Sequence, residues 1–451
     1  MNKSGNKPRR IEPRTLKGFR DFLPEGMIPR ERMIDTVRGV YRSFGFSPID
    51  TPALEYLDIL TGKGSEETDR QIYRFQDHGG RDVGLRFDLT IPLARFAAQH
   101  IHALGTPFKR YHIATVWRGE NTQRGRFREF MQCDFDTIGS LSVASDIETG
   151  LVIHEMLMAL GFDDFTIRLN NRQLLNGLLE KLNLADKSTA ILRSLDKLAR
   201  IGADKVAEEM IASAGTSNEQ AAQVLQLAHL AGSNDELLSA VAPLVAGSEV
   251  GEAGVERLAR ILAGLRAAGV PEGRVKLDVS IARGLDYYTG AIYETFLDAL
   301  PGIGSVCSGG RYDNLAELYS TQSLPGIGAS LGLDRLLAAM QELEMIETVR
   351  TPADLLVTCF DLDQLDRYLQ IATLLRAAGV GVELYPDSKK LGQQLKYADK
   401  RGYQLVIIAG PDELAKNECQ VKEMSSGESS NLSLDQDGQH LIDHVRSLLN
   451  Q

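Results

Sequence analysis

Apolar and polar residues alternate along residues 109–139, on either side of the polar run ENTQRG at 120–125. A period of two is typical of β-strands, and a polar run that contains glycine favours a turn between them. The pattern therefore predicts a hairpin, in which Arg118 and Glu120 share one face of the first strand. On the second strand one face carries Arg126, Arg128, Phe130, Gln132, Asp134 and Asp136, and the other, assigned to the core, carries Phe127, Met131, Cys133 and Phe135.

Helical spacing of apolar residues predicts helices at about 28–44, 90–102 and 142–160. In the last of these, Val143, Ile147, Leu151 and Met158 fall on one stripe together with His154, which we interpret as a core histidine. Residues 46–55 contain two prolines and are expected to be extended. Short strands are expected at 73–75, 83–87, 165–169, 275–279, 291–296 and 302–307.

The order of these elements predicts a mixed α/β fold with more than one domain. Residues 186–268 are rich in Ala, Leu, Glu and Lys without a strand pattern, which indicates a helical insertion between two strand-rich halves of one domain. Residues 323–340 run from a glycine-rich strand into a helix. From 351 to 451 strands and helices alternate, which predicts a separate α/β domain with a largely parallel sheet. Residues 1–17 form a basic arm, which we expect to be flexible.

Composition sets bounds on the class of protein. With 451 residues, 43% hydrophobic and 25% charged, the chain resembles a globular protein of roughly three domains. Its net charge of −11 argues against coating nucleic acid through bulk charge, although local basic patches could still bind it. Four cysteines lie far apart without CxxC spacing, which favours free thiols in a reducing cytoplasm. No apolar run suits a membrane span or a secretory signal.

The hairpin is the first stretch that could carry chemistry. Its polar face has guanidiniums near the turn, an aromatic ring in the middle, and an amide and carboxylates at the far end. Such a gradient suits a ligand that is anionic at one end, flat in the middle and cationic at the other. An exposed hairpin of mixed charge is the alternative interpretation.

Three further stretches could also carry chemistry. IARGLDYYTG (281–290) places an arginine, an aspartate and two tyrosines in a glycine-bounded loop, where an arginine is otherwise an ordinary surface residue. GIGASLGLDRL (326–336) follows no complete βαβ unit and lacks a P-loop ending, so its glycines could instead let a flat ring lie against the backbone beneath Arg335. FDLT (87–90) begins a helix with a carboxylate and a hydroxyl, which a simple N-cap would also explain.

Together these stretches resemble the class II aminoacyl-tRNA synthetases, and within them the histidyl-tRNA synthetase family. Residues 46–55, with Pro52, look like the family's dimer-forming first motif. Trp117-Arg118-Gly119-Glu120 through Phe130 is similar to the second motif, and 328–335 to the third. The histidyl-specific resemblance rests on ARGLDYYTG, GGRYD (309–313) and FMQCDFDTIG (130–139). It covers essentially the whole chain, and it implies an α+β catalytic domain with an antiparallel sheet at 18–350 and an anticodon-binding domain at 351–451.

The resemblance also implies a role for individual residues. Arg118 and Arg283 would be catalytic, Arg283 serving in place of one metal ion, so that no protein-bound metal is expected beyond the Mg²⁺ carried by ATP. ATP would be bound by Arg118, Glu120, Arg126, Phe130 and Arg335. Histidine would be bound by Asp88, Leu89, Thr90, Arg118, Gln132, Asp136, Arg283, Tyr287 and Tyr288.

Asp136 raises a question of distance. At about 3.3 Å per residue it would lie roughly 20 Å from Phe130 along a straight strand, too far for one histidyl-adenylate. We therefore expect the strand to curl or bulge near Asp136.

The implied reaction is ATP-dependent activation of histidine and its transfer to tRNA(His), by a cytoplasmic homodimer. Lysines and arginines between Ser388 and Arg401 would offer phosphate contacts, or form a solvated helix face. The alternative function is a related non-catalytic regulatory subunit of ATP phosphoribosyltransferase. It is disfavoured because Arg118, Phe130, Arg283 and Arg335 are present and a C-terminal α/β domain follows. A synthetase for another amino acid is a third possibility, which RGLDYYTG disfavours.

Overall fold

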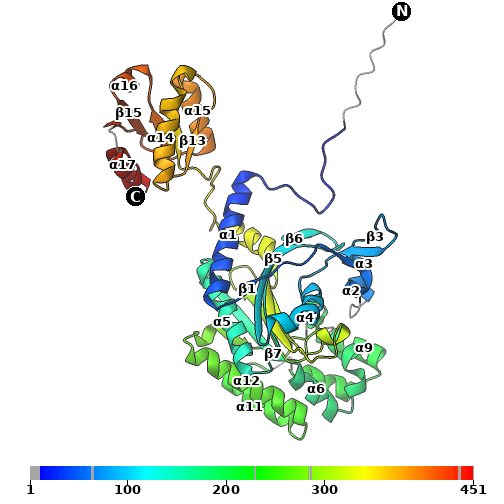
Figure 1. Cartoon of the computed structure of the whole chain (residues 1–451). Coiled ribbons are helices and arrows are strands. Elements are labelled where there is room, and N and C mark those ends of the chain that lie inside the picture. Colours follow the sequence, from blue (N-terminus) through cyan, green and yellow to red (C-terminus); the bar gives the residue numbers. More distant parts are fainter. Residues whose placement is uncertain are drawn as a thin grey trace, which may run out of the picture. The chain divides into compact units, whose positions relative to one another are not determined.

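The computed structural model describes residues 11–61, 66–227, 230–282, 284, 287–434 and 438–449. The chain divides into two compact units (Figure 1). The first comprises Met1–Asp21 and Met33–Met345, and the second comprises Phe22–Arg32 and Ile346–Gln451. Helix α1 (Pro24–Ser43) is shared between them and starts earlier than expected, at a proline that is tolerated in the first turn of a helix.

Among the described residues, the first unit is built on an eight-stranded, mostly antiparallel sheet in the order β1-β5-β6-β11-β10-β9-β7-β8. The two edge pairs, β1 with β5 and β7 with β8, are parallel. The central hairpin of β5 and β6 confirms the first prediction from the alternating pattern. The strands are β1 (Ser47–Pro48), β5 (Phe108–Trp117), β6 (Glu129–Ile138), β7 (Phe165–Asn171), β8 (Val275–Leu277), β9 (Ala291–Leu297), β10 (Cys307–Tyr312) and β11 (Gly326–Gly332).

The strand expected at 302–307 is wrong. Residues Pro301–Ile303 form a 3-10 turn, and β10 instead runs through the glycines that suggested a turn. Those glycines permit close approach of neighbouring strands, because a Cβ at Gly309 would lie 2.3 Å from the carbonyl oxygen of Gly328 on β11. Glycine inside a strand often marks such an approach rather than a strand end.

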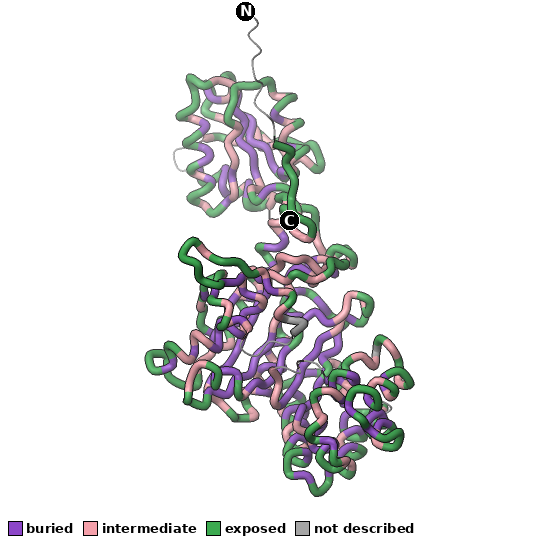
Figure 2. Tube along the Cα trace, turned by 90° about the vertical axis from the view of Figure 1, so that its right-hand side faces the viewer, coloured by how far each residue is buried: buried purple, intermediate pink, exposed green. Residues whose placement is uncertain are grey.

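The strand register gives the sheet two different faces, because directly paired residues share a face. One face carries Tyr111, Phe135 and Ala329 in neighbouring strands and packs against α1, where the Tyr41 hydroxyl donates to the Cys133 carbonyl at 2.8 Å. The other face carries a polar row formed by His112, Asp134, Ser330, Ser308 and Glu294. Every residue of β6 from Gln132 to Ile138 is buried, so the alternative of an exposed hairpin is wrong (Figure 2).

Helix α5 (Val143–Ala159) covers the apolar face (Figure 1). Its buried stripe differs from the expected one and comprises Asp146, Thr149, Gly150, Val152, Ile153, Met156 and Leu157. Met158 is exposed. The His154 side chain is 12% exposed, and its Nδ1 lies 3.6 Å from Glu155 Oε1. The expected stripe is wrong because the buried face contains Asp146, and a search for apolar residues at helical spacing does not include a carboxylate.

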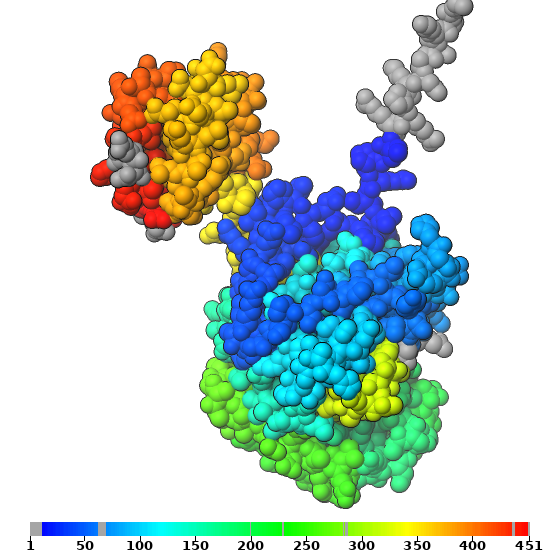
Figure 3. Space-filling model, in the orientation of Figure 1, coloured from blue at the N-terminus to red at the C-terminus, as the bar shows by residue number. Residues whose placement is uncertain are grey.

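The described residues from 188 to 267 are helical, as expected, and form a continuous surface at one end of the first unit (green in Figure 3). Arg257, on the last of these helices, donates to the Asp146 carboxylate of α5 at 2.5 Å and so ties the helical segment to the sheet domain. The helices in this region are α6 (Arg172–Lys181), α7 (Ser188–Leu195), α8 (Leu198–Ile201), α9 (Ala203–Ala214), α10 (Asn218–Gln226), α11 (Asn234–Val245) and α12 (Glu249–Ala267).

A small antiparallel sheet, β2-β4-β3, lies near α4 in the first unit. A core of Ile91, Leu93, Leu315 and Leu324 joins α4 to the segment before β11, and the two lie side by side in Figure 3. The elements are β2 (Leu54–Tyr56), β3 (Arg74–Gln76), β4 (Asp82–Leu85), α2 (Leu57–Thr61), α3 (Glu66–Gln71), α4 (Thr90–Leu104) and, after β11, α13 (Leu333–Glu342).

The second unit has a five-stranded sheet among its described residues, in the order β13-β12-β14-β15-β16. Strands β13, β12 and β14 are parallel, but β15 and β16 are antiparallel, so the sheet is mixed rather than largely parallel. The elements are β12 (Leu355–Val357), β13 (Val382–Leu384), β14 (Leu405–Ile408), β15 (Glu418–Glu423), β16 (Ser429–Ser433), α14 (Leu365–Ala377), α15 (Leu391–Arg401), α16 (Pro411–Ala415) and α17 (Gln439–Leu449).

The four cysteines are buried and none forms a disulfide, which confirms the expectation of thiols rather than disulfides. Among the described residues, no helix is both long enough and apolar enough to cross a membrane.

Candidate active site

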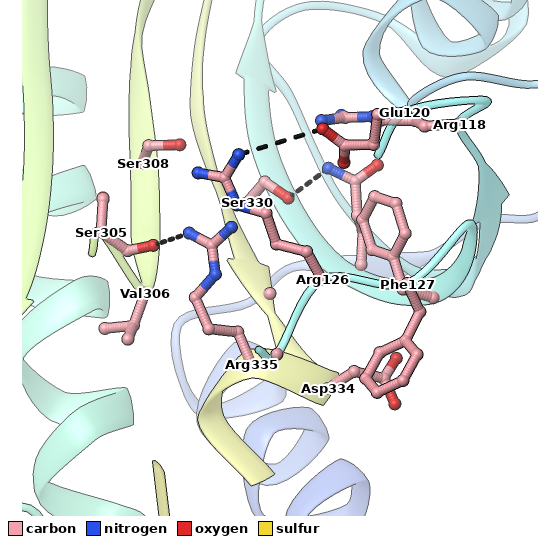
Figure 4. Close-up of a pocket in the computed structure, with 14 residues that line it drawn as sticks. Arg118, Glu120, Arg126, Phe127, Ser305, Val306, Ser308, Ser330, Asp334 and Arg335 are labelled. Atoms are coloured by element: carbon pink, nitrogen blue, oxygen red, sulfur yellow. Dashed lines mark hydrogen bonds and ion pairs between the residues drawn. The ribbon is translucent and has the colours of Figure 1, made fainter. Parts of the chain in front are cut away.

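A pocket lies on the polar face of the first sheet, between the hairpin and the start of α13 (Figure 4). It gathers all five residues predicted to bind ATP and two predicted to bind histidine, Arg118 being common to both sets, although they come from distant parts of the sequence. Those residues are Arg118, Glu120, Arg126, Phe130, Gln132 and Arg335.

The hairpin turn is longer than the alternating pattern suggested. Strand β5 ends at Trp117 and β6 begins at Glu129, so Arg126 and Arg128 lie in the connection, where strand alternation does not apply. Their predicted shared face is therefore wrong: Arg126 lines the pocket, whereas Arg128 donates to the Glu120 carbonyl at 3.1 Å. Gly125, at φ +66°, allows the turn to approach Arg335, whose Cγ would lie 3.4 Å from a Cβ at this position.

Arg118 is held at the junction between the hairpin and the segment before α4. Its Nε donates to the Phe87 carbonyl at 3.1 Å. Its guanidinium lies 4.2 Å from the centre of the Phe87 ring and 5.2 Å from that of Phe130. Because one N–H is hydrogen-bonded and two aromatic rings lie close to the guanidinium, the cation is held in orientation before any ligand binds.

Two more guanidiniums make the pocket suitable for an anion. Arg126 Nη1 lies 3.9 Å from Glu120 Oε2, a loose and partly exposed pair that a phosphate could replace. Arg335 donates to the Ser305 carbonyl (Figure 4). The pocket holds both Phe130 and Arg335, but the stacking of adenine between them stays a prediction.

In the FDLT stretch the two oxygens of Asp88 have different partners. Asp88 Oδ1 accepts from the backbone N–H groups of Thr90 and Ile91 at 3.1 and 2.9 Å, which is the N-cap function. Its Oδ2 accepts from the Tyr287 hydroxyl at 3.5 Å, so the second oxygen faces the tyrosine loop. Leu89 is fully buried, and its carbonyl accepts from Arg110 at 3.4 Å.

Asp136 is buried in a charged network. Arg110, its direct partner on β5, places Nη2 2.6 Å from Asp136 Oδ2, and the Tyr312 hydroxyl donates to Oδ1. Burial raises the pKa of the Asp136 carboxyl, while Arg110 and Tyr312 oppose that rise. The expected bulge is wrong, because β6 pairs with β5 residue by residue from Glu129 to Ile138.

Tyr288 lies against the strands beside this network. A Cβ at Gly310 would come within 2.9 Å of its ring, and burial raises its pKa well above the ordinary value. The glycines of β11 were expected to leave space for a flat ligand ring. Instead, the space next to Gly328 is filled by Asp136, whose Oδ1 would lie 2.2 Å from a Cβ, and that next to Gly326 is filled by Tyr312.

Gln132 connects the two parts of the site. Its Nε2 donates to Ser330 Oγ at 2.8 Å, and its Oε1 is buried without a hydrogen-bond partner among the described residues. Ser330 also hydrogen-bonds the Asp134 carboxyl, whose pKa burial raises to about 7. The unsatisfied Oε1 is therefore oriented to accept a donor from a ligand.

Sequence reasoning did not assign a role to Arg110, Ser330 or Asp334. The pairing of Arg110 with Asp136 across β5 and β6 becomes visible only with the strand register. Arg283 lies outside the described residues. Among the described residues, no group of three or more His, Cys, Asp or Glu side chains could hold a metal ion.

An antiparallel sheet with an arginine-bearing hairpin and an arginine in the first turn of the following helix defines the catalytic domain of a class II aminoacyl-tRNA synthetase. Comparison with known proteins narrows this class. A family model described as histidyl-tRNA synthetase matches residues 18–336, and one described as an anticodon-binding domain matches residues 354–441. The chain therefore belongs to the histidyl-tRNA synthetase family.

Individual relatives agree with this result. The chain is 61% identical to the histidine–tRNA ligase of Rhodopirellula baltica over 94% of its own length and 96% of the relative's. It is 46% identical to that of Wolinella succinogenes over 93% and 95%. The crystal structure of histidyl-tRNA synthetase from Nostoc sp. PCC 7120 superimposes with a TM-score of 0.86 at 34% identity, covering 97% of this chain and all of that one.

A structure described as an ATP phosphoribosyltransferase regulatory subunit/histidyl-tRNA synthetase, from Bacillus halodurans C, shares the fold with a TM-score of 0.74. Its identity is only 22%, so it supports the fold alone. The regulatory-subunit alternative is therefore not favoured over the ligases at 46–61% identity.

Proposed function

We propose that this protein activates L-histidine with ATP and transfers it to tRNA(His) for protein biosynthesis. The observation that carries the proposal is the pocket itself, which combines three guanidiniums with an aromatic ring. Through Gln132 it adjoins a group of carboxylates and tyrosines, called the histidine chamber below, which consists of Asp88, Asp136, Tyr287 and Tyr288. Phosphates fit the first part and a cationic amino acid fits the second. Relatives that are 61% and 46% identical over nearly the whole chain carry the name histidine–tRNA ligase.

In this reaction the histidine carboxylate attacks the α-phosphorus of ATP, and pyrophosphate leaves. The adenylate is then attacked by the terminal ribose hydroxyl of the tRNA. The protein supplies position and fixed charge rather than a nucleophile. Arg118 would contact the α-phosphate and the carboxylate, Arg126 the outer phosphates, and Phe130 with Arg335 the adenine. Mg²⁺ would enter with ATP as part of the substrate, because it usually keeps several waters and binds substrate phosphates.

The histidine side of the site follows from the chamber beside the pocket. Asp88, Thr90 and the Oε1 atom of Gln132 would receive the ammonium group. Asp136, with Tyr287 and Tyr288, would enclose the imidazole, whose two nitrogens need polar partners. Leu89, which is buried next to Asp88, would form part of the wall of this chamber. Arg283 is assigned to the reacting carboxylate and phosphate from the resemblance alone.

The decisive experiment is amino-acid-dependent ATP–pyrophosphate exchange with each of the twenty amino acids, followed by charging of tRNA(His). Exchange with histidine alone, and formation of histidyl-tRNA, would establish the proposed function. No exchange with any amino acid, together with stimulation of an ATP phosphoribosyltransferase, would favour the regulatory-subunit alternative.

Residues 351–451 are proposed to read the tRNA, with residues 18–350 catalysing both steps and 1–17 remaining a flexible arm. Support comes from the anticodon-binding match at 354–441. The helix α15 ends in Lys400 and Arg401, where phosphate contacts would be available. The cysteine thiols are consistent with a cytoplasmic location.

We expect the protein to be a homodimer of about 99 kDa, twice the chain mass of 49.6 kDa. In support, the small sheet that follows the proline-containing stretch exposes Leu54, Tyr56 and Phe75, which are 40%, 53% and 51% exposed. Apolar side chains gathered in this way favour an isologous contact. Sedimentation that shows a stable monomer near 50 kDa at micromolar concentration would contradict the dimer.

Replacing Asp136 with asparagine tests the histidine chamber. The isosteric amide keeps the shape and an oxygen that can still accept from Arg110, whereas alanine would leave Arg110 buried beside a cavity. Loss of a charged hydrogen-bond acceptor is worth about 1.5–3 kcal/mol, so kcat/KM for histidine should fall by about tenfold or more. The KM for ATP should change by less than about twofold. Unchanged use of histidine in exchange assays would remove Asp136 from the pocket.

A further inference from the structure

The segment from Leu16 to Arg20 lies on the outer side of the nucleotide pocket and is bound to both of its walls. The backbone N–H of Arg128, in the hairpin connection, donates to the Gly18 carbonyl at 2.9 Å, and the Arg128 side chain donates to the Lys17 carbonyl at 3.4 Å. Phe19 packs edge-on against Tyr73 with ring centres 6.2 Å apart. The basic arm was expected to span residues 1–17, so this segment begins within its last two residues.

Arg20 makes the most specific of these contacts. Its Nη2 lies 2.6 Å from Asp334 Oδ1, and its guanidinium lies 3.7 Å from the centre of the Phe127 ring. Asp334 and Phe127 both line the nucleotide pocket (Figure 4). An ion pair combined with cation–π stacking suits the planar guanidinium of arginine better than the ammonium of lysine.

Asp334 connects the two walls of the pocket. Its side chain is 3% exposed, and its Oδ2 accepts from the backbone N–H of Met131 on β6 at 2.7 Å. Met131 directly follows Phe130, and Asp334 directly precedes Arg335. One carboxylate therefore fixes the spacing between the two residues proposed to enclose the adenine ring, and Arg20 holds and neutralises that carboxylate.

We propose that Arg20 is a positioning residue for nucleotide binding, which acts through Asp334 and Phe127 to hold β6 and the start of α13 at the spacing that ATP requires. The inference rests on the proposed function for the identity of the nucleotide. Without Arg20, a negative charge beside the pocket would lose its counter-ion and Phe127 would lose the cation on its ring. Both changes disfavour a polyanionic ligand, and neither touches the histidine chamber.

The test compares Arg20→Ala and Arg20→Lys with Arg14→Ala, which removes the same charge from an exposed position six residues earlier. ATP and histidine are titrated separately in ATP–pyrophosphate exchange, ATP binding is measured by calorimetry, and thermal unfolding is recorded for each variant. We expect Arg20→Ala to weaken ATP binding and raise its KM by about tenfold, the lower end of what a charged hydrogen bond contributes. The KM for histidine should stay within about twofold.

Arg20→Lys should give an intermediate KM for ATP, because it restores the charge but not the planar stacking, and Arg14→Ala should match the wild type. Equal changes for ATP and histidine, or a lowered unfolding temperature with normal ATP binding, would show a merely structural role and overturn the inference. If the wild type supports no exchange, the proposed function fails, while calorimetry with ATP still decides whether Arg20 positions the nucleotide pocket.

Discussion

Replacing Arg118 with alanine is expected to lower kcat for adenylate formation by about 10²- to 10³-fold, the usual cost of removing one fixed group that stabilises charge in a transition state. Arg118 is suited to this role because its orientation is fixed in advance by the Phe87 carbonyl at 3.1 Å and by the rings of Phe87 and Phe130. A group that needs no reorganisation stabilises developing charge more effectively than a mobile side chain does. Single-turnover formation of the adenylate measures this step directly.

The pattern of kinetic constants separates this role from simple binding. If Arg118 acts in the transition state, kcat and kcat/KM fall together, whereas a loss of ground-state binding raises KM for ATP and leaves kcat unchanged. Arg200→Ala, which removes an exposed arginine from α8, is the matched control and should behave like the wild type. A normal kcat in Arg118→Ala would refute the catalytic assignment.

The hairpin shows what sequence pattern can predict. Alternation located β5 and β6 and placed Gln132, Asp134 and Asp136 on the same face. This works because successive side chains in an uninterrupted strand point to opposite faces of the sheet. It failed at Arg126 and Arg128, where the chain had already left the strand. Side-chain direction is thus predictable inside an element and not in the connection beside it.

Long-range pairing explains most of what the sequence could not predict. Asp136 was assigned to the histidine site, but its partners, Arg110 and Tyr312, could not be predicted because they are 26 and 176 residues away and meet it only through the sheet register. The space at Gly328 and Gly326 is used by Asp136 and Tyr312 rather than by a ligand ring, whereas Gly332 lines the pocket with no atom closer than 3.8 Å to a Cβ at that position. Local sequence shows that room exists, and only the fold shows what fills it.

The GGRYD stretch illustrates the same limit. It was used as a signature of the histidyl family without a role for its individual residues, and neighbouring residues in it point to opposite faces of β10. Tyr312 faces the Asp136 network, whereas Arg311 faces the core and reaches α5. Arg311 donates to Asp146 through Nε at 3.1 Å and Nη2 at 2.8 Å. Burial lowers the pKa of Arg311, but hydrogen bonding to Asp146 more than offsets this and raises it above its ordinary value.

Asp146 is therefore expected to be a centre of stability, and Asp146→Ala should lower the free energy of unfolding by about 3–5 kcal/mol, the usual cost of leaving a buried charge without its partner. The Asp146 side chain is 0% exposed and that of Arg311 is 2% exposed, and the same carboxylate also accepts from Arg257 at 2.5 Å. Its loss would leave two guanidiniums without their partner at once and remove the ion pair between α12 and α5.

The matched control is Glu272→Ala, which breaks an ion pair with Arg266 at 3.0 Å in which the side chains are 59% and 52% exposed. Exposed pairs contribute about 0–1 kcal/mol, so this variant should unfold at nearly the wild-type urea concentration. Equal urea midpoints for the two variants would refute the proposed role of Asp146. Because Asp146 lies on the opposite face of the sheet from the pocket, the exchange activity per folded molecule of Asp146→Ala should stay close to normal.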